Sequence, residues 1–481
     1  MKPAFLACVC AAGALFLDAP ARGQQPTPPA AGQAADPHAQ LKRDADAAYR
    51  KRDFAAAIRL TSQVLAQARE DAVALYLRGS ARVEMGIAGR DTKLIRDGIE
   101  DARRAIQSDR AQNVNFYLPY LYGMTHLTAL EGEREHAETA VKIATDVIGR
   151  PGLAVSSRSN VSYQRALAQT KLGNDRQAVD DFRQTIELDT NHLAARMALG
   201  ETLVRLGEIQ PAEEAYSAAV AQFPDNPLVF NNRGMFYQSQ QRHADAITDF
   251  TKAIELHPGH LEAHLNRGFT RLSSGDYPAA QSDFARAVEL QPDHAPAHSL
   301  LATSKLMQNN VREAFDDYLK VIELRPSYAP ARADIGFAYF FSKHYDTAAD
   351  AFAQALKLAP ESKYLVPWRY AALALAGRQD IANQDYQSIA EAPAANRDWF
   401  DQLTLFLMGQ LGEQELLAAV EAENAAQRDA QLCEAYYFIG VRRQKDGQGD
   451  PARYFQRAVE SRSTQLSAYR AATLELSRLR Q

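Results

Sequence analysis

The stretch PLVFNNRGMFYQSQQRHADAITDFTKAIELHP at residues 227–258 decides the fold, because the chain repeats its pattern. Residues 261–292 read LEAHLNRGFTRLSSGDYPAAQSDFARAVELQP, so the two stretches start 34 residues apart. When they are aligned, an Asn-Arg-Gly triplet, an alanine, a phenylalanine and a closing proline fall on the same places. A fixed period of this length is the signature of a repeat array.

Six consecutive units follow this pattern, and they start at Ser159, Leu193, Pro227, Leu261, Ala295 and Ala329. One place in each unit holds a small residue: Ala166, Gly200, Gly234, Gly268, Ala302 or Gly336. A second small place holds alanine, and four residues later an aromatic residue follows: Phe182, Tyr216, Phe250, Phe284, Tyr318 or Phe352. Five of the six units close with a proline, whereas the first has Thr190.

Each unit predicts a pair of helices, because two apolar stripes at helical spacing are separated by a turn such as SSGDY at residues 273–277. The small residues let the two helices approach closely, the aromatic residue fills the space beside the next pair, and proline ends the second helix. One pair cannot bury its apolar face alone, so neighbouring pairs must stack. The pattern resembles the tetratricopeptide repeat. This resemblance implies an all-α, right-handed superhelix (an α-solenoid) of about ten helix-turn-helix repeats.

The repeat pattern also divides the chain into segments. Residues 159–362 hold the six regular units, and residues 41–158 hold divergent units, one of which carries an insertion around residues 88–96. Residues 363–398 form a degenerate unit in which Tyr370 replaces the small residue. Divergent ends are expected, because a terminal unit must present a polar outer face to water.

The N-terminal residues 1–21 have the layout of a secretory signal peptide, with a short basic start, an apolar run and a small-residue cleavage pattern. The apolar run is shorter than the roughly 20 residues that a membrane-spanning helix needs. Residues 22–40 are rich in proline, glutamine and alanine, which predicts a flexible leader. We therefore expect a cleaved signal peptide, a periplasmic or secreted protein, and no transmembrane segment.

Cysteine usage and charge exclude several other classes. Cys8 and Cys10 lie inside the apolar run without a lipobox, so we expect no lipid anchor, and removal of the signal leaves only Cys433. The mature chain then has no intrachain disulfide and must be stabilised by packing. A net charge of −5 gives no electrostatic argument for nucleic-acid binding.

The C-terminal residues 399–481 follow a different pattern that ends in one more helix pair. They contain FLMGQLGEQELL, CEAYYFIG and RYFQRAV. This order of motifs resembles the C-terminal part of the NlpI family of bacterial periplasmic tetratricopeptide lipoproteins. The resemblance implies a non-enzymatic adaptor that brings a periplasmic protease to peptidoglycan hydrolases, and it implies a homodimer. The missing lipobox and the long N-terminal array are departures from that family.

The first helix of each unit is expected to line a concave groove. The place two residues before the small residue is polar in four of the six units, and in two it holds asparagine, which resembles the asparagine ladder in the repeats of O-linked N-acetylglucosamine transferase. Ala198 and Leu300 interrupt this ladder. We predict that the groove binds a peptide or partner protein through Gln164, Lys171, Arg205, Asn232, Met235, Asn266, Phe269 and Asp334. The alternative is that the asparagines cap or solvate an open helix face.

Other motifs give no site. His257, His260 and His264 have ligand-like spacing, but they straddle the turn between two units, where histidine is an ordinary turn residue, so we predict no metal site. No catalytic motif or nucleotide-binding loop is present, and we predict neither an enzyme nor a cofactor. Cys433 lies among aromatic residues, which favours an inert core thiol.

The sequence therefore predicts a non-enzymatic periplasmic adaptor that binds peptide segments or partner proteins in its groove, including a periplasmic protease or peptidoglycan hydrolases. The alternative is a structural scaffold of an envelope secretion or polysaccharide-assembly complex, which shares every feature except the tail.

Overall fold

The computed structural model describes residues 36–109, 113–308, 310–420, 424–461, 463 and 466–479. The predicted signal peptide and most of the predicted leader lie outside these residues. The chain forms two compact units, Met1–Phe236 and Tyr237–Gln481, each of which is described by itself. Every regular element in the described ranges is a helix. None of these helices is long and apolar enough to cross a membrane.

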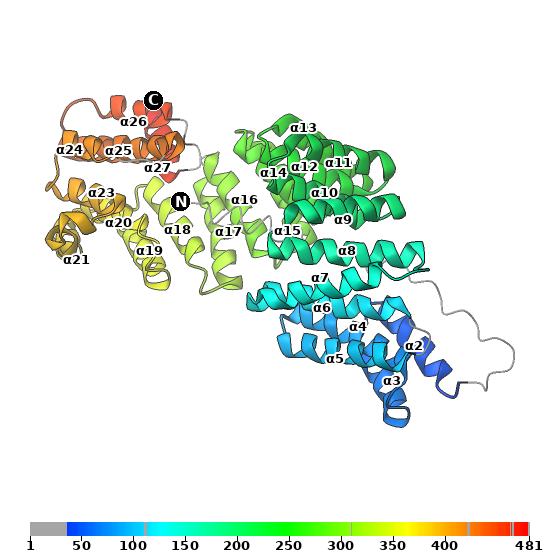
Figure 1. Ribbon diagram of the computed structural model, residues 1–481. Helices are drawn as coiled ribbons and strands as arrows, with labels where there is room; N and C mark the ends of the chain where they lie inside the picture. Colours follow the sequence, from blue (N-terminus) through cyan, green and yellow to red (C-terminus); the bar gives the residue numbers. More distant parts are fainter. Residues whose placement is uncertain are drawn as a thin grey trace. The chain divides into compact units, whose positions relative to one another are not determined.

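The first unit is a stack of helical hairpins. From α2 to α11, each helix packs against the next one in the chain. The first helices of successive hairpins also contact each other: α2 with α4, α4 with α6, and α6 with α8. Figure 1 shows these helices following one another in chain order. The unit contains α2 (Ala39–Arg50), α3 (Phe54–Gln67), α4 (Ala72–Gly89), α5 (Thr92–Ser108), the 3-10 turn η2 (Val114–Phe116), α6 (Tyr117–Glu131), α7 (Arg134–Ile148), α8 (Val155–Leu172), α9 (Asp175–Leu188), α10 (Leu193–Arg205), α11 (Ile209–Gln222) and most of α12 (Pro227–Ser239).

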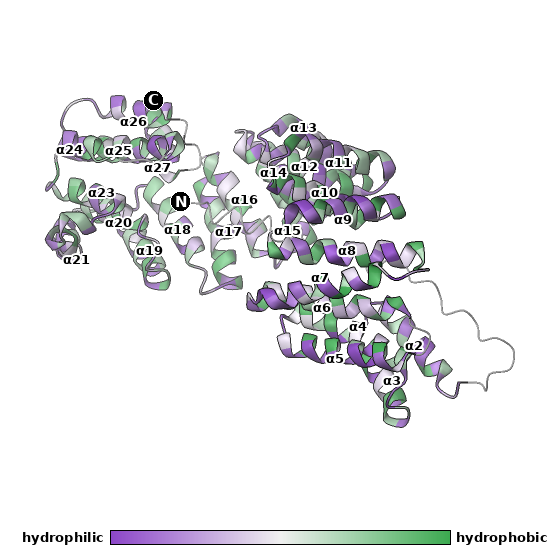
Figure 2. Ribbon diagram, in the orientation of Figure 1, coloured by the Kyte–Doolittle hydropathy of each residue, from purple (hydrophilic) through white to green (hydrophobic). Residues whose placement is uncertain are grey.

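The second unit continues the hairpins and ends in the C-terminal helices. Its helices are α13 (His243–Leu256), α14 (Leu261–Ser273), α15 (Tyr277–Leu290), α16 (Ala295–Met307), α17 (Val311–Leu324), α18 (Ala329–Phe341), α19 (Tyr345–Leu358), α20 (Leu365–Leu375), α21 (Gln379–Asp385), α22 (Gln387–Glu391), α23 (Trp399–Met408), α24 (Glu413–Ala418), α25 (Ala425–Asp446), α26 (Pro451–Glu460) and α27 (Ser467–Leu479). The 3-10 turn η3 (Ala394–Asn396) lies between α22 and α23. In Figure 2, polar and apolar residues alternate around the helices, as amphipathic packing requires.

The predicted all-α solenoid of helix-turn-helix repeats is confirmed. Five of the six predicted unit starts are the first residues of helices α10, α12, α14, α16 and α18. The sixth, Ser159, lies inside α8, which begins at Val155. The insertion predicted around residues 88–96 lengthens the two helices on either side. α4 has 18 residues and α5 has 17, compared with 13 and 14 in α14 and α15.

The small and aromatic places of the repeat meet in the core. A β-carbon added to Gly268 would lie 2.7 Å from the ring of Phe284, and one added to Gly336 would lie 2.6 Å from the ring of Phe352. Both phenylalanines are fully buried. Glycine therefore lets each first helix approach the aromatic residue of its own second helix, which holds the hairpin together.

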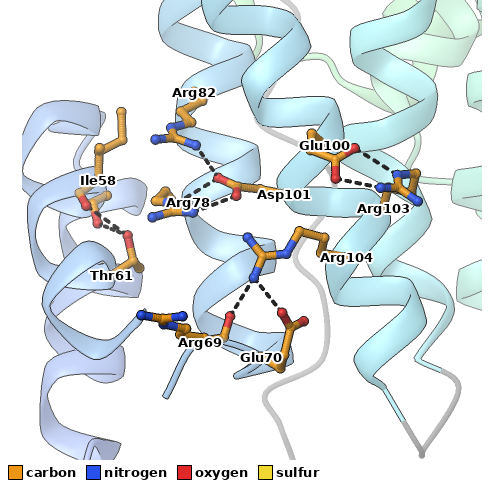
Figure 3. Close-up of polar contacts among 11 residues, drawn as sticks. Ile58, Thr61, Arg69, Glu70, Arg78, Arg82, Glu100, Asp101, Arg103 and Arg104 are labelled. Carbon is orange, nitrogen blue, oxygen red and sulfur yellow. Dashed lines mark hydrogen bonds and ion pairs between the residues drawn. The ribbon is translucent and has the colours of Figure 1, made fainter. Parts of the chain in front are cut away.

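Buried arginine–aspartate pairs also join the two helices of a unit. In two regular units the partners are 16 residues apart, with nitrogen–oxygen distances of 2.6 Å: Arg165–Asp181 and Arg267–Asp283. In the longer α4–α5 hairpin, Asp101 accepts hydrogen bonds from Arg78 and Arg82, each at 2.7 Å (Figure 3). These pairs were not predicted from the sequence, although the fixed spacing of arginine and aspartate in the regular units is a signal for them.

The C-terminal helices fold back onto the last repeats of the second unit. One apolar cluster runs from α16 to α27 and includes Trp368, whose ring stacks on Tyr437 with 5.0 Å between centroids. Trp399 begins α23 and donates a hydrogen bond from Nε1 to Glu434 on α25 at 2.7 Å. Cys433 is fully buried in this cluster, and burial raises the pKa of its thiol to about 12. These properties are those of an inert core thiol.

Candidate functional site

The first helices of successive hairpins in the first unit, α2, α4, α6, α8 and α10, form what we call the first-helix face. Lys171 at the end of α8 lies within electrostatic reach of His126 on α6 and Glu201 on α10, because its charge shifts the pKa of both. Burial is the larger cause: it lowers the pKa of His126 to about 4 and raises that of Glu201. Glu201 still contacts solvent.

Arg205 and Gln164 lie on the same face but differ in their surroundings. Arg205 on α10 is exposed and donates a hydrogen bond to Asp175 at 2.8 Å. Gln164 on α8 is buried, and its side-chain oxygen has no hydrogen-bond partner among the described residues. A buried acceptor without a donor is costly, which makes Gln164 a position where a ligand donor would be favoured.

The two asparagines of the predicted ladder lie in different units. Asn232 on α12 belongs to the first unit and is half-buried, as is Met235, whose sulfur lies 3.6 Å from the side-chain nitrogen of Asn231. Asn266 on α14 belongs to the second unit and is buried, with 3% of its surface exposed. Phe269, on the same helix, is half-buried against the cluster that contains Phe284.

Asp334, the last predicted groove residue, faces the chain's own C-terminal helix. Burial raises the pKa of Asp334 to about 6, against the opposing positive charge of Arg470 on α27. Helix α27 packs on α18, and Arg478 of α27 donates a hydrogen bond to the backbone carbonyl of Phe341. The charge of Arg470 also reaches Tyr277 and Tyr318. The first helix α18 is therefore contacted by α27.

Sequence reasoning missed Glu84 on the first-helix face. Glu84 on α4 lies five residues after Gly79, just as Lys171 follows Ala166 and Arg205 follows Gly200 by five residues. The equivalence of these places could have identified it. The longer α4–α5 hairpin obscured the alignment, because it breaks the 34-residue period there.

Sequence profiles of the tetratricopeptide repeat match residues 163–227, 237–304 and 329–362. The chain therefore contains tetratricopeptide repeats.

Several solved structures resemble this repeat protein. PilF of Pseudomonas aeruginosa is 22% identical, with 48% of this chain and 96% of PilF covered and a TM-score of 0.36. YrrB, described as a tetratricopeptide protein with an unusual peptide-binding site, is 19% identical. The match covers 41% of this chain and 97% of YrrB, with a TM-score of 0.31. MamA of Desulfovibrio magneticus is 21% identical. The match covers 37% of this chain and 96% of MamA, with a TM-score of 0.30. No curated protein sequence matches this chain.

The histidines of the HPGHLEAH segment have structural roles in the repeats. His260 precedes α14 and accepts a hydrogen bond from the backbone of Ala263, and His264 lies 3.1 Å from the carbonyl oxygen of Pro258. One period later, His294 and His298 repeat both arrangements. In the described part of the chain, these histidines form no cluster with metal-like geometry, whereas Glu131, Glu133 and His136 do. Arg96 already pairs with Glu131 in that cluster at 2.7 Å.

A cavity of about 310 Å³ in the first unit is lined by Ser62, Leu65, Ala66, Arg69, Arg78 and Arg104. Two of its three arginines are neutralised, because Arg78 pairs with Asp101 and Arg104 pairs with Glu70 (Figure 3). The charge that lines this cavity is thus largely satisfied within the protein.

Burial of Asp334 gives a pH-dependent prediction. Its folded-state pKa of about 6 lies above the ordinary value of 3.8, so the folded protein binds the proton more tightly than the unfolded chain. The charged carboxylate therefore lowers the free energy of unfolding above pH 6. This effect disappears below pH 3.8, the ordinary pKa that Asp334 has in the unfolded chain. We expect Asp334→Asn to increase the free energy of unfolding of the second unit at pH 7 and to change it little at pH 4.

Urea denaturation at the two pH values measures this difference. Asp350→Asn on α19 is the control, because Asp350 is exposed. Equal effects of the two substitutions at pH 7, or a loss of stability in Asp334→Asn, would show that burial of the carboxylate is not what matters at this position.

Proposed function

We propose that this tetratricopeptide repeat protein is a non-enzymatic periplasmic adaptor that binds peptide segments or partner proteins along the first-helix face. The observation that carries the proposal is the line of polar side chains on successive first helices of the first unit. It includes an unpartnered buried acceptor at Gln164, a carboxylate at Glu201 and two exposed cations, Lys171 and Arg205. Tetratricopeptide repeats bind protein or peptide partners, and such a face offers both hydrogen bonds and charge to a bound chain.

The periplasmic location and the type of partner come from the sequence. The signal-peptide pattern at residues 1–21 supports export, and the motifs of the tail support a role like that of NlpI proteins, which link a protease to peptidoglycan hydrolases. The second candidate is a scaffold of a secretion or polysaccharide-assembly complex. The repeat array and the export signal support it equally, and the tail favours the adaptor.

Affinity capture from an envelope extract of the source organism tests the proposal. The bait is the full mature chain, compared with a variant that carries Gln164→Ala and Lys171→Glu. The matched control is Arg103→Glu, which changes an exposed arginine on the second helix α5. We expect proteases or peptidoglycan hydrolases to be captured by the wild type and the control, and lost from the double variant.

The other outcomes separate the two candidates. Capture of secretion or polysaccharide-assembly components instead of hydrolases would support the scaffold. Capture that is the same for all three baits would exclude the first-helix face as the binding surface. Detection of the protein in the cytoplasmic fraction, rather than in the periplasm or medium, would contradict the proposed location.

A further inference from the structure

Glu84 is a half-buried carboxylate on α4, the middle of three adjacent first helices. Among the described residues, no hydrogen bond or ion pair to its side chain is present. Burial raises the pKa of Glu84, and the positive charge of Arg52 acts in the opposite direction without forming an ion pair. A carboxylate that is partly removed from water without a partner is unfavourable, so this position would gain from a cation.

Two tyrosines on the neighbouring first helices lie within electrostatic reach of Glu84. Tyr49 lies on α2 and Tyr122 on α6, and both helices contact α4. Burial raises the pKa of both phenols, and the charge of Glu84 adds to that effect, which places the carboxylate within electrostatic reach of each ring. The two rings are themselves held in place. Tyr49 packs on Phe54 with 5.5 Å between centroids, and Tyr122 packs edge-on against His126 at 4.5 Å.

The charge of Arg52 reaches Glu84 and both tyrosines, but no ion pair between Arg52 and Glu84 is present. Arg52 is exposed, and its guanidinium lies 6.0 Å from the ring centroid of Phe54. Arg50 is paired with Asp46 on its own helix at 2.7 Å. His126, whose ring contacts Tyr122, is neutral near pH 7, because burial lowers its pKa to about 4.

We propose that Glu84, Tyr49 and Tyr122 form a binding site for a cationic side chain, lysine or arginine, of a peptide that lies along the first-helix face. An ammonium or guanidinium group between two aromatic rings gains cation–π attraction, and the carboxylate supplies the counter-charge. The proposal rests on the proposed function, because it names the chemistry of the ligand for that same face. It assigns the cation of the ligand to the α2–α4–α6 part of the face, separate from Lys171 and Arg205.

A phage-displayed library of random 12-residue peptides, selected against the full mature chain, supplies the probes. Enriched peptides are synthesised with a fluorescent label, together with versions in which lysine is replaced by norleucine and arginine by citrulline. We expect enrichment of lysine or arginine. We also expect the Glu84→Gln variant to bind the cationic peptides about tenfold or more weakly than the wild type does. The wild type should bind the neutral versions with a similar loss of affinity. In Glu84→Gln, the preference for the cationic peptide over the neutral one should become smaller, because only the two rings still attract the cation.

Three further variants distinguish this site from a structural effect. Tyr49→Phe keeps the ring and should bind like the wild type, whereas Tyr49→Ala should weaken binding. Glu100→Gln changes an exposed carboxylate on the second helix α5, outside the first-helix face, and should leave the affinity of these peptides unchanged. Thermal unfolding of each variant shows that the fold is intact.

The failures of the two proposals can be told apart. Enriched peptides that bind equally to Glu84→Gln and the wild type, or that tolerate norleucine and citrulline, would overturn the cation site while leaving peptide binding established. A library that yields no peptide for the wild type would contradict the cation site and peptide binding together.

Discussion

Phe352→Ala is expected to lower the free energy of unfolding of the second unit by about 3–5 kcal/mol. Phe352 on α19 has no exposed surface, and its ring meets Phe337 edge-on with 5.1 Å between centroids. It also fills the space that Gly336 leaves open on α18. Loss of the ring removes its burial and leaves a cavity between two helices whose backbones already approach closely. Urea denaturation followed by circular dichroism measures the loss.

The matched control for this prediction lies on the same helix. Leu358 ends α19 with 44% of its surface exposed, so Leu358→Ala should change stability by no more than about 0.5 kcal/mol. Similar losses for the two substitutions would mean that the aromatic place does not hold the hairpin together. Hydrogen exchange should show the loss first in α18 and α19, because stability in a repeat array is a sum of local terms.

The repeating part of the fold could be predicted from the sequence because its interactions are local and periodic. The small residue, the aromatic residue and the turn act within one hairpin, so their spacing predicts helix starts such as Leu261 and Ala295. The position of α27 could not be predicted in the same way. It depends on contacts such as that of Arg478 with the backbone of Phe341, which lies far from it in the chain and has no periodic signature.

The candidate site was predictable only in part, for a related reason. Lys171 and Arg205 occupy a repeated place in regular units, and the structure brings Lys171 into the reach of Glu201. Glu84 occupies the same place in a unit whose period is broken, so alignment alone passed over it. Asp334 also follows the repeat, but its surroundings are set by α27 and not by its own unit.

This difference between the units bears on the proposed function. A groove residue that faces α27 is in contact with the protein itself, whereas Lys171, Glu201 and Arg205 are exposed on the first-helix face of the first unit. Partner binding is therefore best sought on the first unit, and substitutions there should affect binding without disturbing the apolar cluster that holds the tail.

Asp101→Ala is the second substitution with a large expected effect, a loss of about 3 kcal/mol or more in the stability of the first unit. Asp101 on α5 is buried, with 2% of its surface exposed, and accepts hydrogen bonds from Arg78 and Arg82 on α4. Its removal leaves both guanidinium groups partly buried without their counter-charge, and it removes a link between the two helices. Urea denaturation gives the loss, and hydrogen exchange should place it in α4 and α5.

Glu100, the residue before Asp101, provides a close control. It also pairs with an arginine, Arg103 on its own helix α5, but this pair faces solvent. Figure 3 shows the two pairs side by side, and the side chains of Glu100 and Arg103 are 52% and 49% exposed. An exposed pair is weakened by solvent and salt, so Glu100→Ala should change stability little. High salt should reduce even that change, while the loss in Asp101→Ala should persist. If the two substitutions gave equal losses, the buried pairs would be no more important to the hairpin than its surface charges, and the spacing of arginine and aspartate would have no structural meaning.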